Sequence, residues 1–466
     1  MRKNYFLASI LAGMLLSAPV SADEISMHTS AAIGEKLSIA LNENVKATLT
    51  WGDGVSEEIS FQGDEVQITV KHQDFTLKSD QSITSLYCAD CSLTELNVKN
   101  APALQALICS GNQLADLDLS ANSGLKNLDC SGNLLTALTF NKCPELVFIN
   151  VADNQMDKLY TSSLPDLKTL ICSNNKFTSL SLSSQKKLET LWCQGNEITS
   201  INIAPTARPV QVCAFDNQLA TLKTDALDEV KELWLDNNKL KTLNLSETHV
   251  EVVSVSNNLL TSITWNEDDK ESLKAFYADG NELMINSLPT LFKKDTLITY
   301  NIDNQRPYHL VDQINVGERL DVNDLVRKNA WGYTARPDIV WKDEQGTELK
   351  RNEDFKYLNG VFTFHKPFKS IHAEVTSPLY PGAMMGFADL QVLDPTGIED
   401  VAVNQNLQIV AEAGQIQLTT PVGIMVRIYN VSGNLVVNSS VEAGTSSWNL
   451  PAGLYVVNGK KVLLAR

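Results

Sequence analysis

Two cysteines near residue 90 have the spacing of a redox or metal motif. Cys88-Ala89-Asp90-Cys91 holds two thiols close together, which suits thiol–disulfide exchange or half of a zinc site. A zinc site needs further ligands, and the sequence has no second pair of this kind and no histidine nearby. The chain has 8 cysteines, so disulfides are the other chemistry to consider.

The histidines and the sequence motifs do not indicate an enzyme. The 6 histidines are scattered, and the pair His365 and His372 lacks a carboxylate at a set spacing that would complete a metal site. The sequence has no HExxH, no GxSxG, no Walker loop and no glycine-rich dinucleotide motif after a strand. We therefore expect no catalytic residue, no metal and no cofactor. An enzyme with an unrecognised site in residues 306–395 stays an alternative.

An asparagine recurs every 21 residues through the centre of the chain. The series is Asn112, Asn133, Asn154, Asn175, Asn196, Asn217 and Asn238, followed by Asn258 and Asn281 at slightly different intervals. Counting back 21 residues from Asn112 reaches Cys91, which can stand in for the asparagine, and a degraded last repeat is expected near Asn304. This register predicts stacked repeats in which each asparagine side chain bonds neighbouring backbone at a turn.

Each repeat predicts a short parallel strand with one face turned inward. The residue five before each asparagine is apolar, and the residue three before it is small or apolar, so both columns share one face. Cysteine fills the second column at Cys88, Cys109, Cys130, Cys172 and Cys193. Parallel strands lie about 4.8 Å apart, whereas a disulfide needs its β-carbons about 3.8 Å apart, so we expect free, buried thiols there. Cys143 and Cys213 are expected to be the accessible thiols.

The repeat unit Leu-x-x-Leu-x-Cys-Ser-x-Asn-x-Leu-Thr-x-Leu-x-Leu-Ser resembles the leucine-rich repeat family, in the 21-residue form of secreted Bacteroidetes proteins. The repeats occupy residues 84–305, about half of the chain. The resemblance implies a solenoid with one parallel sheet. It also implies a non-enzymatic recognition protein that binds protein ligands, with a role in adhesion or host contact.

The outward strand positions predict a binding surface. Trp192 and Trp234 lie two repeats apart at equivalent positions, about 10 Å from each other on strand spacing, and Phe215 lies on the repeat between them. The inward columns are already filled, and exposed aromatics beside polar groups mark interfaces or sugar platforms. The alternative is that these rings pack on each other or on a neighbouring domain. The candidate ligand-binding residues are Trp192, Phe215, Trp234, Gln194, Glu232, Asp236, Tyr277 and Phe148.

The regions on both sides of the repeats predict further β domains, so the expected fold is mainly β. Residues 23–83 alternate with a period of two and predict a small N-terminal β cap. Residues 306–395 contain a strand at Ile339-Val340-Trp341 and a hairpin signal at Asn359-Gly360, and they resemble an immunoglobulin-like sandwich. Residues 396–466 predict a second sandwich.

The motifs in residues 396–466 point to a sorting function. Val426-Arg427-Ile428-Tyr429-Asn430-Val431-Ser432-Gly433 and Leu450-Pro451-Ala452-Gly453-Leu454-Tyr455 resemble the C-terminal sorting domain of type IX secretion. A structural domain without a sorting role is the alternative.

The N-terminus and the net charge predict an exported protein. Arg2 and Lys3 precede an apolar run, and Val20-Ser21-Ala22 fits the signal-peptidase rule, so residues 1–22 are predicted to be a signal peptide that is removed after Ala22. No later run is long enough for a transmembrane helix. The net charge of −17 argues against nucleic acid as a partner. We expect a secreted or cell-surface protein that binds a host or matrix protein, or alternatively a glycan.

Overall fold

The computed structural model describes residues 22–270, 272–290, 299–394, 408–412, 414–421, 423–431, 434–457 and 460–464. The predicted signal peptide, except for Ala22, and the Ser432-Gly433 part of the sorting motif lie outside these residues. The chain divides into two compact units. The first extends to His309 and includes Val322–Val340 and Ala373–Ala388, and the second comprises Leu310–Asp321, Trp341–His372 and the residues from Asp389 on.

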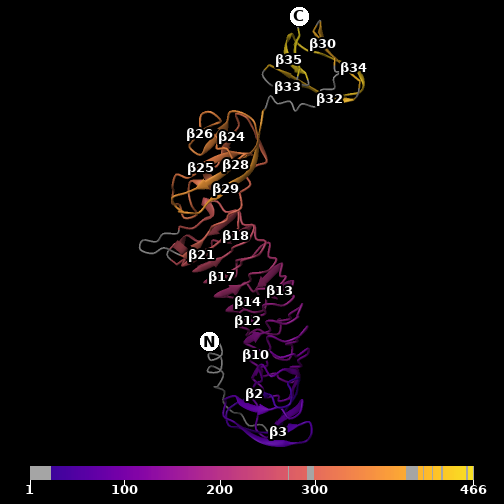
Figure 1. The fold of residues 1–466 in the computed structure, drawn as a ribbon, viewed down its shortest axis with the longest axis vertical. Coiled ribbons are helices and arrows are strands. Elements are labelled where there is room, and N and C mark those ends of the chain that lie inside the picture. The colour runs from indigo at the N-terminus through magenta and orange to yellow at the C-terminus, as the bar shows by residue number, and fades with distance from the viewer. Residues whose placement is uncertain are drawn as a thin grey trace. The chain divides into compact units, whose positions relative to one another are not determined.

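A 13-stranded sheet runs through the first unit. Its parallel strands pair in register, one from each repeat, and lie one above another in Figure 1. They are β7 (Ser85–Tyr87), β9 (Ala106–Ile108), β10 (Asn127–Asp129), β11 (Phe148–Asn150), β12 (Thr169–Ile171), β14 (Thr190–Trp192), β16 (Gln211–Cys213), β17 (Glu232–Trp234), β19 (Val252–Ser254), β21 (Ala275–Tyr277) and β22 (Thr299–Asn301). The predicted solenoid with one parallel sheet is confirmed.

Short strands also form on the opposite side of the repeats. β13 (Ser179–Leu182) pairs with β15 (Ser200–Ile203), and β18 (Thr242–Leu245) pairs with β20 (Ser262–Trp265), both in parallel. The chain between the two sets of strands turns at each repeat, so the apolar columns of both sets enclose one core. Leu170, Leu180 and Leu191 illustrate this core, because each is buried.

The inward columns are buried as the sequence predicts. In the 13-stranded sheet, the middle residue of each strand from β9 to β19 is 0% exposed, and the five cysteines of the second column are likewise 0% exposed. All eight cysteines are free. In this column cysteine acts as a small apolar side chain, and burial raises the pKa of Cys109 and Cys130 well above the ordinary thiol range.

The recurring asparagines form a ladder of buried hydrogen bonds, as expected. Asn175 is typical: its Nδ2 donates to the Val151 carbonyl at 2.9 Å, and its Oδ1 accepts from the Met156 amide at 2.9 Å. Both partners belong to the preceding repeat, so each asparagine satisfies backbone groups that the short strands leave unpaired. Cys91 occupies the equivalent position before Asn112, as predicted, and its thiol contacts the Ser38 carbonyl at 3.3 Å.

The last amide of the ladder is one residue away from the position that the sequence indicated. Gln305, and not Asn304, accepts from the Leu283 amide at 2.9 Å and donates to the Ala278 carbonyl at 2.8 Å. Asn304 instead has a positive φ of 52°, which is the conformation of the residue before the asparagine in the earlier repeats. The longer side chain of glutamine spans the gap that the irregular last repeat leaves.

The residue before each ladder asparagine turns the chain through the left-handed region. Gly195 has φ of 68° and Asn174 has φ of 52°, one repeat apart. A β-carbon at Gly195 would collide with the Asn174 Oδ1 unless that side chain moved, so glycine is favoured there by space as well as by φ.

A second buried column, which the sequence did not reveal, lies at the other corner of the repeats. Asn122 Nδ2 donates to the Val98 carbonyl at 3.1 Å, and Gln185 Nε2 donates to the Thr161 carbonyl at 2.6 Å. Cys143 belongs to this column and is 0% exposed, with its Sγ at 3.4 Å from the Leu119 carbonyl. The expectation that Cys143 is accessible is therefore wrong.

Residues before the repeats, together with β8 from the first repeat, form the N-terminal β structure. An antiparallel sheet has the order β4-β3-β6-β1-β8, with β1 (Asp23–Thr29), β3 (Val45–Trp51), β4 (Ser56–Phe61), β6 (Asp74–Ser79) and β8 (Leu93–Asn100). β2 (Lys36–Leu41) and β5 (Val66–Thr69) instead extend the 13-stranded sheet, where β2 pairs antiparallel with β7. Ile25, Leu49 and Leu77 are 0% exposed and form part of the buried side of the antiparallel sheet.

Segments from beyond the repeats close the C-terminal end of the solenoid. The Trp331 ring lies edge-on to the Trp265 ring, with centroids 6.0 Å apart. The Tyr380 hydroxyl donates towards the carbonyls of Leu288 and Pro289 at 3.2 and 3.0 Å. These contacts cover the apolar end of the last repeats, next to the 3-10 turns at Glu267–Lys270 and Ile285–Ser287 and the short helix α1 (Asn323–Val326).

The remaining strands form two pairs of sheets. The first pair is β23-β29-β28-β25 and β24-β27-β26, with β23 (Gln313–Asn315), β24 (Arg319–Asp321), β25 (Asp338–Asp343), β26 (Phe355–Leu358), β27 (Val361–Phe364), β28 (Phe368–Thr376) and β29 (Met385–Leu393). Trp341 is buried against Phe362 and Phe364. The hairpin predicted at Asn359-Gly360 is present between β26 and β27.

The last pair of sheets is β30-β31-β34 and β33-β32-β35-β36. Its strands are β30 (Gln408–Glu412), β31 (Gln415–Thr420), β32 (Ile424–Asn430), β33 (Leu435–Val441), β34 (Gly444–Asn449), β35 (Gly453–Val457) and β36 (Lys460–Leu464). Ile416 and Leu418 from one sheet share a core with Val426 and Ile428 from the other. Within the described residues, no helix has the length and apolar character needed to cross a membrane.

Candidate functional site

The structure places all eight candidate residues on the outward face of the 13-stranded sheet or directly after its strands, and each is half-buried. Six of them gather on three consecutive strands, β14, β16 and β17. Tyr277 and Phe148 lie apart from the six, because β19 separates β21 from β17 and β12 separates β11 from β14. The two groups of rings are therefore not one continuous surface.

Trp192 and Trp234 are fixed on the sheet by a chain of side-chain hydrogen bonds. Trp192 Nε1 donates to Gln211 Oε1 at 2.7 Å, and Gln211 Nε2 donates to Glu232 Oε2 at 2.6 Å. Trp234 Nε1 donates to the same carboxylate oxygen at 3.4 Å. We use the name aromatic patch for Trp192, Gln194, Gln211, Phe215, Glu232 and Trp234. The repeat register places Gln211 at an outward strand position, but the sequence does not indicate that it links the two tryptophans.

Cys213 lies between the two tryptophans. The three strands pair in register, so that Cys213 is aligned with Trp192 on one side and Trp234 on the other. The sheet is therefore regular here, and the thiol is on the outward face and half-buried. Burial, together with the negative charge of Glu232, raises the pKa of Cys213 to about 12. At neutral pH this thiol is protonated and acts as a small side chain.

The polar members beside the rings have different roles. Asp236 accepts from the Ser254 hydroxyl at 2.6 Å and from the Ser256 amide at 2.8 Å, so it ties its repeat to the next one. Gln194 has a buried side-chain oxygen without a hydrogen-bond partner among the described residues. An unpaired buried acceptor is unfavourable, and because this oxygen has almost no solvent-accessible surface, a ligand docking from solvent does not reach it without rearrangement.

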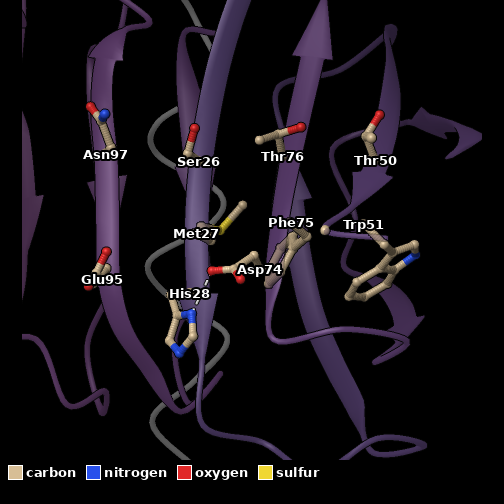
Figure 2. A pocket seen from close by; sticks show the side chains of 11 residues that line it. Ser26, Met27, His28, Thr50, Trp51, Asp74, Phe75, Thr76, Glu95 and Asn97 are labelled. Carbon is tan, nitrogen blue, oxygen red and sulfur yellow. Dashed lines mark hydrogen bonds and ion pairs between the residues drawn. The ribbon is translucent and has the colours of Figure 1, made fainter. Parts of the chain in front are cut away.

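A second hollow lies on the polar side of the N-terminal sheet, with a volume of about 300 Å³. Figure 2 shows one row of short polar side chains across four strands, formed by Asn97, Ser26, Thr76 and Thr50. Glu95, His28 and Asp74 lie beside this row, while Met27, Phe75 and Trp51 are buried on the other side of the sheet. The alternation in these strands predicts the two faces, but the sequence did not point to a site here.

His28 and Asp74 form the charged centre of this hollow. His28 Nδ1 lies 2.6 Å from Asp74 Oδ1, and His72 Nδ1 lies 3.6 Å from the other carboxylate oxygen. The hydrogen bond from His28 lowers the pKa of Asp74 below its ordinary range. In the part of the chain that the structure describes, no group of three His, Cys, Asp or Glu side chains is arranged to hold a metal ion.

A family model for leucine-rich repeats, in two copies, matches residues 165–205. Together with the stacked parallel strands and the asparagine ladder, this match shows that the chain contains leucine-rich repeats, a scaffold that typically serves protein interactions. A search of curated proteins finds no match.

Several solved structures are similar to part of the chain. The functional domain of InlJ from Listeria monocytogenes, whose description mentions a cysteine ladder, is 17% identical, with 68% of this chain and 92% of that chain covered and a TM-score of 0.43. YopM from Yersinia pestis, described as a leucine-rich effector protein, is 22% identical, with 54% and 67% covered and a TM-score of 0.42. The leucine-rich repeat protein LIC12759 from Leptospira interrogans is 19% identical, with 40% and 62% covered and a TM-score of 0.31.

Proposed function

We propose that this chain is a secreted or cell-surface recognition protein that binds a protein ligand through the aromatic patch of its solenoid sheet. One observation carries the proposal: Trp192 and Trp234 are held on the outward face by Gln211 and Glu232. Rings that are fixed before binding lose little freedom when a partner docks, so they make effective anchors. The repeats in which they lie are a scaffold typical of protein interaction.

The partial burial of Trp192 and Trp234 helps to decide between a binding surface and the alternative that the two rings only pack on the sheet. Trp192 and Trp234 are half-buried, so each keeps part of its surface in solvent. Their N–H groups donate to side chains on the same face of the sheet. Large aromatic side chains with an exposed face and a satisfied polar end are typical of interfaces. This combination supports a binding surface over simple packing.

The proposed localisation outside the cell is based on sequence features near the two ends of the chain. The predicted signal peptide, cleaved after Ala22, would export the protein, and the resemblance to a type IX sorting domain in residues 396–466 would deliver or attach it at the cell surface. The paired sheets of residues 306–395 are consistent with an immunoglobulin-like spacer. On this proposal the protein is of the Bacteroidetes type and acts in adhesion or host contact.

A matched pair of variants tests the binding site. The mature chain, residues 23–466, is assayed on arrays of extracellular-matrix proteins and of glycans, beside Trp192→Ala/Trp234→Ala and the control Tyr160→Ala. Tyr160 is 66% exposed and is an aromatic of the same solenoid outside the patch. The double variant should lose at least tenfold in affinity for a protein on the array, while the control keeps it. Signals confined to the glycan array, or an unchanged double variant, would contradict the proposal.

The proposed localisation has a separate test. N-terminal sequencing of the exported protein should begin at Asp23, and deletion of residues 398–466 should keep the protein inside the cell envelope. Recovery of an intact Met1 on surface material would contradict the predicted signal peptide. Unchanged delivery of the deletion variant would show that the C-terminal domain has no sorting role.

A further inference from the structure

The outward face of the repeats carries negative formal charge only. This face comprises the outward residues of each strand and the residue two positions after each strand. From Ser85 to Asp303 these positions hold no lysine or arginine. Their charged residues are Asp129, Glu232, Asp236, Asp279 and Asp303. Lysines occur in the loops that precede the strands, where carboxylates of neighbouring repeats pair with them, as Lys168 does with Glu189 at 2.7 Å. A face with this charge complements a cationic partner.

Glu232 brings this charge into the aromatic patch. Its Oε2 accepts from Gln211 and Trp234, and within the described residues its other oxygen has no hydrogen-bond partner and the carboxylate forms no ion pair. The charge acts on the centre of the patch, because it contributes to the raised pKa of Cys213. A half-buried carboxylate without a counter-ion is better stabilised when a cation docks beside it.

The spacing of the rings suits a planar cation. Cys213 is small and is aligned between Trp192 and Trp234 on adjacent strands. A cation centred over Cys213 lies about one strand spacing, about 4.8 Å, to the side of each tryptophan column. Cation–π attraction acts within roughly 6 Å of a ring centroid, so an indole whose face turns towards Cys213 would lie within its range.

We propose that the protein partner inserts an arginine side chain over Cys213, between Trp192 and Trp234 and against Glu232. This inference rests on the proposed function and specifies the chemistry of its partner. Arginine fits better than lysine because its planar guanidinium stacks on aromatic faces and carries five donors in a fixed fork. Those donors match the free oxygen of Glu232.

Peptides of equal length show whether binding depends on the charge of the arginine side chain or on its shape. Hexa-arginine, hexa-lysine and hexa-citrulline are titrated into the full mature chain by calorimetry at about 0.15 M salt, where distant charges are screened beyond roughly 8 Å. Citrulline has nearly the shape of arginine without its charge. Hexa-arginine should bind at least threefold more tightly than hexa-lysine and at least tenfold more tightly than hexa-citrulline. Equal binding of the arginine and citrulline peptides would overturn the inference.

Two isosteric variants on the same face of the sheet test whether the arginine binds beside Glu232. Glu232→Gln and Asp129→Asn each remove one negative charge, and both new amides can still accept the hydrogen bonds of the carboxylates they replace. Glu232→Gln should weaken hexa-arginine at least tenfold, whereas Asp129→Asn, which lies far along the sheet from the rings, should change it less than twofold. Equal losses in both variants would show that only the general field of the face attracts the peptide, which overturns the inference.

The outcomes also distinguish this inference from the proposed function. If a protein on the array requires Trp192 and Trp234 but binds Glu232→Gln as well as the parent, the surface is a protein site and the arginine inference is wrong. If the array protein is indifferent to the two tryptophans, the proposed function fails whatever the peptides show. Thermal unfolding of each variant confirms that it is folded before either conclusion is drawn.

Discussion

Cys143 lies one repeat after Asn122 and takes the same place in the fold. Asn122 Nδ2 contacts the carbonyl of Val98, and Cys143 Sγ contacts the carbonyl of Leu119, which is the equivalent group one repeat later. A thiol and an amide can occupy the same buried corner because each can approach the same carbonyl. The column therefore protects Cys143 from solvent even though its neighbours in the sequence are exposed.

Thiol labelling of the native chain should modify Cys213 alone, and slowly. The reactive form is the thiolate, and because the pKa of Cys213 is raised to about 12, its labelling rate should rise about tenfold for each pH unit from pH 7 upward. Cys143, whose pKa is raised to about 11, should stay unmodified because it is fully buried. Mass spectrometry after labelling checks this, with Cys213→Ser as the unlabelled control. Equal labelling of Cys143, or a Cys109–Cys130 bridge, would contradict the structure.

Asn175→Ala should destabilise the solenoid by about 1–3 kcal/mol. The change leaves the Met156 amide buried without a partner, whereas the Val151 carbonyl keeps the hydrogen bond from Asn154 Nδ2 at 3.2 Å. The control is Asn174→Gly, at an exposed position with φ of 52°, which should change stability by less than about 1 kcal/mol. Urea unfolding measures both. Similar small losses in the two variants would argue against the ladder as a source of stability.

Gly195→Ala should cost about 1–3 kcal/mol, and part of that cost should disappear when Asn174 is also replaced by glycine. The new methyl group collides with the Asn174 side chain, and φ of 68° adds strain of about 1–2 kcal/mol that remains in the double variant. A double-mutant cycle from unfolding curves gives the coupling. Strict additivity would show that backbone strain alone sets the cost.

The Trp192→Ala/Trp234→Ala variant should be less stable than the parent by about 1–3 kcal/mol and should stay folded. The sequence predicted exposed rings, whose removal would be expected to change the stability little. The half-buried rings and their bonds to Gln211 and Glu232 make a measurable loss the better expectation. Differential scanning calorimetry measures it, and Tyr160→Ala should stay within about 0.5 kcal/mol of the parent. Complete unfolding would identify the tryptophans as packing residues.

The His28 and Asp74 pair predicts an effect on pH titration. The pKa of Asp74 is lowered by its hydrogen bond to His28, so His28→Ala should return it towards its ordinary value of 3.8. Because the folded-state pKa is depressed, the pair stabilises the fold above the unfolded pKa, and this contribution is lost as pH falls through the folded value. Carboxyl NMR of both proteins measures the pKa. An unchanged Asp74 pKa would show that the pair is not coupled.

Much of the solenoid could be predicted because its repeats have a constant period. Asn112 and its successors fixed the strand positions, the inward columns and the outward face without any information on distant contacts. Gln305 was missed because it lies 24 residues after Asn281, so counting by 21 residues reaches Ile302, three positions short of it. The corner that holds Asn122 was missed because its next members are a cysteine and a leucine, which share burial but no chemistry.

The side-chain contacts of the two sites were harder to predict. Trp192 meets Gln211, which belongs to the next strand, and the choice of partner depends on rotamers that the pattern does not set. His28 and Asp74 are 46 residues apart, and they meet because β1 and β6 pair antiparallel in a register that places one opposite the other. Antiparallel register depends on the turns and loops between the strands, which vary in this region.

The asparagine ladder gives the solenoid a direction. Each asparagine satisfies an amide and a carbonyl of the repeat before it, so the amide that it binds gains this partner only when the following repeat is in place. During synthesis, the last folded repeat would therefore always have an amide that lacks its asparagine partner. Each further stretch of about one repeat would supply the partner for the repeat before it. The dependence ends when Gln305 reaches back to Leu283. Truncation from the C-terminus should thus erode the solenoid one repeat further than the cut itself.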